Sequence, residues 1–184
     1  MGIADPEGLP AAFEACIAEG GVVVFPSDTV YGLACAPGND AAVERMYEMK
    51  GRDRSKPAAL MWFSLDALPS LTPRVAVVAS ELLPGAVTLV VGQLGVRVPS
   101  IPLLAGARGP VLQTSANLAG QPDARTLAEV PAEIRSAADL VIDGGELPGV
   151  PSTVVDLTDY EDAGEWRIIR PGAMPAGDLA AALG

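Results

Sequence analysis

The sequence contains no histidine, and this absence excludes whole classes of chemistry. Serine–histidine and cysteine–histidine nucleophilic systems, histidine general bases and histidine-ligated zinc all need an imidazole. The two cysteines, Cys16 and Cys35, are too few for a disulfide framework or a structural zinc site, and we expect both to be small core residues. Any catalysis must therefore use cations, hydroxyls, amides and backbone donors, and we expect no metal ligands from the protein.

Basic residues and long apolar runs are also scarce. Lys and Arg number 12 against 23 Asp and Glu, which gives a formal net charge of −11. This balance argues against strong direct nucleic-acid binding, which needs a basic face. An apolar run such as residues 58–63 is far too short to span a bilayer, and the N-terminus lacks the basic start and apolar stretch of a secretory signal. We therefore expect a cytoplasmic protein that does not bind membranes.

The remaining composition indicates an ordered globular protein, with 49% apolar and 19% charged residues. We expect one domain over residues 1–184, because no internal repeat or long linker divides the chain. Apolar periodicity predicts helices at residues 9–19, 39–49, 74–83, within 126–138, and 176–183. Short apolar runs predict strands at residues 22–25, 30–34, 58–63, 87–93, 95–98, 111–114, 140–143, 153–157 and 166–169. Because several strands follow one another without a helix, we predict a mixed α/β fold: a twisted sheet of parallel and antiparallel strands flanked by helices.

A basic island stands out in this acidic chain. Four of the twelve basic residues, Lys50, Arg52, Arg54 and Lys56, fall within seven positions. A run of this kind is most often a solvated face. Directly after a predicted helix, it also fits a local pocket for a small anion.

Polar clusters follow several predicted strands at the point where each strand ends. They lie at residues 26–29, 50–57, 114–117, 151–153 and 170–172. Strand ends in α/β sheets are where ligands bind, and Ser, Thr and backbone N–H groups there can donate to phosphate oxygens. Each cluster alone is more often a turn, and Arg97, between two valines, also fits an edge residue of a half-buried strand. The two common glycine-rich nucleotide motifs are absent, so any ATP site must use another cradle.

The order of the motifs is more specific than any one of them. Residues 26–33, 50–52 with 56–57, 84–89, 97–99, 114–120, 152–156 and 170–172 occur in the sequence of motifs that resembles the YrdC-like family of L-threonylcarbamoyladenylate synthases. The resemblance covers residues 10–175. It implies a mixed twisted sheet around a deep cationic cavity. It also implies that L-threonine, bicarbonate and ATP with Mg²⁺ give L-threonylcarbamoyl-AMP and pyrophosphate, for threonylcarbamoyladenosine modification of tRNA, with transient contact to the tRNA-modifying transferase complex.

The resemblance assigns roles to individual residues. The catalytic residues that it implies are Lys50, Arg52, Ser115 and Asn117. For threonine and carbamate it implies Thr29, Tyr31, Lys56 and Thr114. For ATP it implies Lys50, Arg52, Arg97, Ser115, Asn117, Ser152 and Arg170. These residue types suit the reaction, because displacement at a phosphoryl centre depends on positioning and charge stabilisation more than on a strong base.

Two other functions stay open at this point. One is an RNA-binding protein, which would use the cationic concavity of the same fold for a phosphate backbone. The other is a carbamoyladenylate-forming paralogue with a different acceptor. The sequence departs from the family pattern at Ser27, where threonine is commoner, and at Leu83, where an aromatic residue is common. Arg54 has no assigned role.

Overall fold

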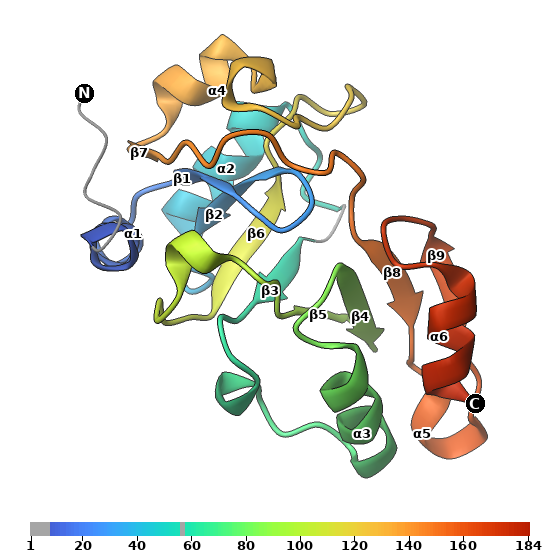
Figure 1. The fold of residues 1–184 in the computed structure, drawn as a ribbon. Helices are drawn as coiled ribbons and strands as arrows, with labels where there is room; N and C mark the ends of the chain where they lie inside the picture. The colour runs from blue at the N-terminus through green and yellow to red at the C-terminus, as the bar shows by residue number, and fades with distance from the viewer. Residues whose placement is uncertain (1–7, 56–57) are drawn as a thin grey trace.

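The structure is a computed structural model that describes residues 8–55 and 58–184 (Figure 1). Its strands are β1 (Val23–Pro26), β2 (Tyr31–Cys35), β3 (Ala59–Met61), β4 (Val87–Val91), β5 (Leu94–Arg97), β6 (Val111–Ser115), β7 (Leu140–Val141), β8 (Thr153–Asp156) and β9 (Arg167–Arg170). Its α-helices are α1 (Leu9–Ala18), α2 (Asp40–Lys50), α3 (Pro73–Leu82), α4 (Ala132–Ala137), α5 (Tyr160–Ala163) and α6 (Ala176–Leu183). Three short 3₁₀ helices are η2 (Leu65–Ala67), η3 (Pro102–Leu104) and η4 (Leu127–Glu129).

The strands form one nine-stranded mixed sheet in the order β7-β1-β2-β6-β3-β5-β4-β8-β9. The pairs β1–β7, β3–β5 and β4–β8 are parallel, and the other neighbouring pairs are antiparallel. The predicted mixed α/β class is therefore confirmed. The antiparallel pairing of β2 with β6 places Gly32 opposite Ser115, so motifs more than 80 residues apart in sequence meet in the sheet.

Both faces of β1 are covered, which explains its continuous apolar run. Val22 and Val24 pack in a cluster with α2 and α4, whereas Val23 and Phe25 pack with Phe13 of α1 in a second cluster. Successive strand residues point to opposite faces, so a strand buried on both sides needs apolar residues at every position. Each of these side chains is fully buried, which stabilises the fold by about 1.5–3 kcal/mol per side chain.

A third cluster covers the other half of the sheet. Helices α3, α5 and α6 gather beside β4 and β8 (Figure 1), and Val78 and Leu179 of α3 and α6 pack with Leu89 and Val155 of these strands. The opposite face of the central strands stays available for the site. Within the described parts of the chain, no helix is long and apolar enough to cross a membrane.

Helix α2 ends where the basic island begins. The side chain of Asn39 accepts a hydrogen bond of 3.1 Å from the backbone N–H of Ala42 and caps the start of the helix. Gly51 ends it in the left-handed conformation with φ of 55°, which is favourable for glycine because it has no Cβ. Lys50 is therefore the last residue of α2, and the chain changes direction at Gly51 before it reaches Arg52.

The predicted element positions are mostly confirmed, with differences at short segments. Helix α4 lies within the range 126–138 where a helix was predicted, and η4 lies in the same range, whereas the strand expected at residues 58–63 is only β3. Sequence reasoning missed α5, which is a single turn of four residues without a periodic pattern. Cys35 is buried as expected, whereas Cys16 is only partly buried.

Candidate active site

A cavity of about 580 Å³ lies against the sheet, within the usual size range of small-molecule sites. Seven neighbouring strands of the sheet contribute residues to its lining: β2, β6, β3, β5, β4, β8 and β9. Three arginines, Arg52, Arg97 and Arg170, line it, and no Asp or Glu is found among the described lining residues. The cavity therefore suits a ligand that carries several negative charges.

Most of the predicted site residues meet at this cavity. Those that line it are Thr29, Tyr31, Arg52, Arg97, Thr114, Ser115, Ser152 and Arg170. Lys50 and Asn117 are buried behind Ser115 and are absent from the described lining. Lys56 lies outside the described residues, so its contact with the amino acid stays a prediction.

Ser27 closes the turn between β1 and β2. Its hydroxyl donates to the carbonyl of Val30 at 2.6 Å and accepts from the backbone N–H groups of Thr29 at 3.1 Å and Val30 at 3.2 Å. Because the single Ser27 proton points to Val30, the 3.0 Å contact with Thr29 needs the Thr29 hydroxyl as donor. Ser27 thus fixes the orientation of Thr29.

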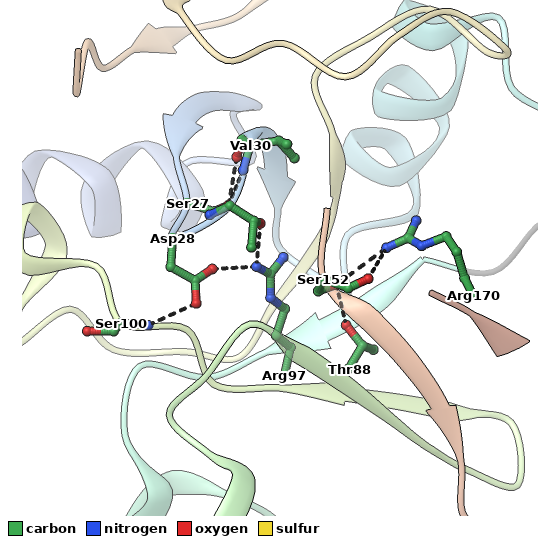
Figure 2. Close-up of polar contacts among 9 residues, drawn as sticks. Ser27, Asp28, Val30, Thr88, Arg97, Ser100, Ser152 and Arg170 are labelled. Atoms are coloured by element: carbon green, nitrogen blue, oxygen red, sulfur yellow. Dashed lines mark hydrogen bonds and ion pairs between the residues drawn. The ribbon is translucent and has the colours of Figure 1, made fainter. Parts of the chain in front are cut away.

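Arg97 connects the turn to the centre of the sheet. It is 4% exposed, and one nitrogen, Nη2, donates to the carboxylate of Asp28 (Figure 2). The same nitrogen also donates to Oγ1 of Thr29 at 2.8 Å. Burial lowers the pKa of Arg97, and the charge of Asp28 opposes this effect. The alternative that Arg97 lies on an edge strand is wrong, because β5 lies between β3 and β4.

Lys50 holds the loop that follows β6. Its ammonium donates to the carbonyl of Ser115, to the carbonyl of Asn117 at 2.7 Å and to Oδ1 of Asn117 at 3.0 Å. These three acceptors match the three N–H donors of an ammonium. Burial, followed by repulsion from Arg52, lowers the pKa of Lys50 to about 8.

The loop held by Lys50 has further internal support. The Ser115 hydroxyl donates to Oδ1 of Asn117 at 2.6 Å, and the Asn117 amide donates to the carbonyl of Gln121 at 2.5 Å. Ser115 alone of this pair lines the cavity. The geometry therefore places Lys50 and Asn117 in support of Ser115.

Arg52 and Arg54, two further members of the basic island, lie at different places in the structure. Nη1 of Arg52 donates to Oγ1 of Thr114 at 2.8 Å, which fixes the guanidinium beside the end of β6 at the cavity wall. Arg54 forms an exposed ion pair of 2.5 Å with Glu44 of α2. Arg54 therefore faces solvent, in agreement with its lack of an assigned role.

Ser152 and Arg170 form the opposite wall of the cavity. Nη2 of Arg170 donates to the carbonyl of Ser152 at 2.7 Å, and the hydroxyls of Ser152 and Thr88 are 3.0 Å apart (Figure 2). Sequence reasoning missed Thr88 and Gln113, which are both buried and line the cavity. The available signal was a polar residue inside an apolar strand, because such a group needs a partner or a ligand when buried.

Tyr31 lines the cavity, but its hydroxyl forms hydrogen bonds within the protein. The hydroxyl accepts from the backbone N–H of Gly144 at 2.9 Å and lies within 3.0 Å of Oδ1 of Asp143 and 2.9 Å of the carbonyl of Gly145. Burial raises the pKa of Tyr31 to about 12. Tyr31 therefore fixes the loop at residues 143–145.

Known proteins resemble this chain in sequence and in fold. The Sua5/YciO/YrdC family model, described as "Telomere recombination", matches residues 15–172. Threonylcarbamoyl-AMP synthase of Pyrococcus abyssi is 30% identical over 91% of this chain and 55% of the relative, and that of Homo sapiens is 35% identical over 92% and 71%. The crystal structure of P. abyssi Sua5 complexed with L-threonine is 29% identical with a TM-score of 0.82, over 98% of this chain and 58% of that one.

The chain thus spans just over half the length of the archaeal relative and about seven tenths of the human one. The family model covers most of the chain, and the motifs at the cavity, from Thr29 to Arg170, lie within its match. The chain belongs to the Sua5/YciO/YrdC family.

Proposed function

We propose that this protein is a threonylcarbamoyl-AMP synthase, which converts L-threonine, bicarbonate and ATP to L-threonylcarbamoyl-AMP and pyrophosphate. The observation that carries the proposal is the cavity, where three arginines and several oriented hydroxyls meet with no carboxylate among the described lining residues. The names of the relatives and the threonine complex of P. abyssi Sua5 support the same reaction.

The chemistry needs charge stabilisation and positioning. Threonine and bicarbonate give a carbamate with loss of water, and a carbamate oxygen then attacks the α-phosphorus of ATP as the bond to pyrophosphate breaks. Arg52, Arg97 and Arg170 would neutralise the phosphate and carbamate oxygens, since guanidinium groups bind two such oxygens at once. Preorganised donors of this kind are worth several kcal/mol in the transition state.

The hydroxyls would orient the two substrates at opposite walls. Thr29 lies on the wall that we assign to threonine, and Ser152 lies on the wall that we assign to ATP. Ser115, held by Lys50 and Asn117, would position the phosphates between them. Lys56 would act at the amino-acid end, as the family resemblance implies.

Magnesium enters this scheme as part of the substrate. Among the described residues, no group of three or more Cys, Asp or Glu side chains is placed to hold a metal ion. Mg²⁺ usually keeps several waters and binds through phosphates, so we propose that it arrives bound to ATP. We also propose a cytoplasmic location and transient contact with the transferase complex that uses the product to modify tRNA.

The RNA-binding alternative is disfavoured by the surface charges. Four exposed or half-exposed arginines, Arg45, Arg54, Arg125 and Arg167, are each paired with a carboxylate. A phosphate backbone would have to compete with these carboxylates, in a chain of net charge −11. Three of the arginines, Arg52, Arg97 and Arg170, instead line a cavity that suits a small ligand.

Omission of single substrates tests the reaction. We expect pyrophosphate release only when ATP, threonine and bicarbonate are all present, with the threonylcarbamoyl-AMP mass in the product. Release that does not depend on threonine would refute the proposal. Activity with carbamoyl phosphate in place of threonine and bicarbonate would favour the carbamoyladenylate-forming paralogue, and tight, salt-sensitive binding of tRNA would favour the RNA-binding protein.

A further inference from the structure

We infer that Asp28 is a positioning residue that fixes the Arg97 guanidinium at the boundary between the threonine and ATP walls of the cavity. The inference rests on the proposed function for its effect on turnover, whereas its structural part stands without it. Asp28 is absent from the described lining of the cavity and would act through Arg97.

The contacts of Asp28 restrict the orientation of the Arg97 guanidinium. The side chains of Asp28 and Arg97 are 11% and 4% exposed, and they form a buried ion pair. The second carboxylate oxygen of Asp28 accepts from the backbone N–H of Ser100 at 3.4 Å, which ties the carboxylate to the segment after β5 (Figure 2). The guanidinium nitrogen bound to Asp28 also donates to Thr29. Two acceptors at one nitrogen define the plane of the guanidinium.

The charge balance gives Asp28 a second effect. An uncompensated buried guanidinium is costly, and removing one partner of a buried ion pair typically costs about 3–5 kcal/mol. Arg170 also repels Arg97 across the cavity and adds to the lowering of its pKa. The carboxylate of Asp28 thus lets two arginines share one cavity while it leaves the cavity-lining side of Arg97 to the ligand.

Another nitrogen of Arg97 takes no part in these contacts. Its Nε is buried and lacks a hydrogen-bond partner among the described residues. Buried donors without partners are rare because each costs free energy, so Nε would gain a hydrogen bond from any ligand oxygen that reached it. A change in the side-chain torsions of Arg97 would move this donor, and the ion pair with Asp28 opposes that change.

A double-mutant cycle with Arg97 tests the inference. Asp28→Asn keeps the shape and removes the charge, and we expect kcat to fall at least about tenfold while the Kd of ATP changes less than about threefold. In the Arg97→Met background, the same change should alter kcat less than about twofold, because the group through which Asp28 acts is gone. Asp156→Asn is the matched control: it breaks the ion pair with Arg167 outside the cavity and should leave kcat unchanged.

A second measurement does not depend on turnover. NMR of the guanidinium nitrogens should show hindered rotation for Arg97 in the wild-type protein and averaged rotation in Asp28→Asn, with Arg97→Lys used for assignment. Equal losses of kcat in both backgrounds, or averaged Arg97 signals in the wild type, would overturn the inference. If the wild type shows hindered rotation but no threonine-dependent pyrophosphate release, the proposed function fails and the role of Asp28 in holding Arg97 stands.

Discussion

Replacement of Lys50 by methionine tests whether the buried ammonium supports the loop that follows β6. Lys50→Met keeps an apolar stem of similar length and removes the ammonium. The carbonyls of Ser115 and Asn117 then lose their Lys50 donor, and so does Oδ1 of Asn117. Oδ1 keeps the Ser115 hydroxyl as a donor at 2.6 Å, so at most two buried acceptors are left unpaired.

Two opposing effects set the change in stability. An unpaired buried acceptor costs about 1–3 kcal/mol, so two cost about 2–6 kcal/mol. The substitution also removes a buried charge, whose burial lowers the pKa of Lys50 from 10.5 to about 8. That difference corresponds to about 3 kcal/mol of unfavourable charge burial. We therefore expect the free energy of unfolding to fall by about 3 kcal/mol at most.

Turnover should respond more strongly than stability. A loosened loop displaces Ser115 from the cavity wall, and we expect kcat to fall at least about tenfold, which corresponds to about 1.4 kcal/mol of transition-state stabilisation. Threonine-dependent pyrophosphate release measures kcat, and urea denaturation measures stability. Arg45→Met on the same helix is the control, because Arg45 pairs with Asp139 on the surface, where each of the two side chains is 40% exposed. Wild-type kcat in a folded Lys50→Met protein would refute the supporting role of Lys50.

Four further predictions concern individual contacts. Turnover should fall as the pH rises through about 8, because neutral Lys50 has two N–H donors for three acceptors, and a pH–rate profile of Lys50→Arg should lack this limb. The stability that Lys50 contributes should instead rise between pH 8 and 10.5, since the unfolded chain binds more protons there, as urea titrations at several pH values can show. Tyr31→Phe should lower the free energy of unfolding by about 1–3 kcal/mol, measured by urea denaturation, because the N–H of Gly144 loses its acceptor. Arg52→Ala should reduce kcat at least about tenfold, whereas Arg54→Ala should leave it unchanged in the same pyrophosphate assay, because an exposed ion pair contributes at most about 1 kcal/mol.

The sequence was sufficient for most elements and for eight of the residues that line the cavity. Apolar runs and helix caps are local signals, so the strand before Ser27 and the cap at Asn39 can be predicted from the neighbouring residues alone. The relation between Lys50 and the loop at residues 115–117 is not local. It depends on the length of α2 and on the pairing of β2 with β6, which no short window contains.

The hydrogen-bond partners of the site residues also depend on the fold and cannot be predicted from the sequence. The sequence predicts Tyr31 and Lys50 as substrate contacts, and those predictions remain untested, but the structure gives the polar ends of both side chains protein partners. Asp28 lies in the first motif, where the sequence assigns it no role. Only the position of β5 at the centre of the sheet brings Arg97 to it.

The end of α2 explains how one basic island serves different purposes. A continuous helix would place Lys50 and Arg54 on one face, four residues apart. The left-handed Gly51 interrupts this repeat, so Lys50 faces the interior, Arg52 faces the cavity and Arg54 returns to Glu44 on the outer surface. The net charge of −11 acts weakly inside the cavity, because exposed charges are screened over about 8 Å at physiological salt. The arginines at short range therefore decide which ligand enters, although the protein as a whole is acidic.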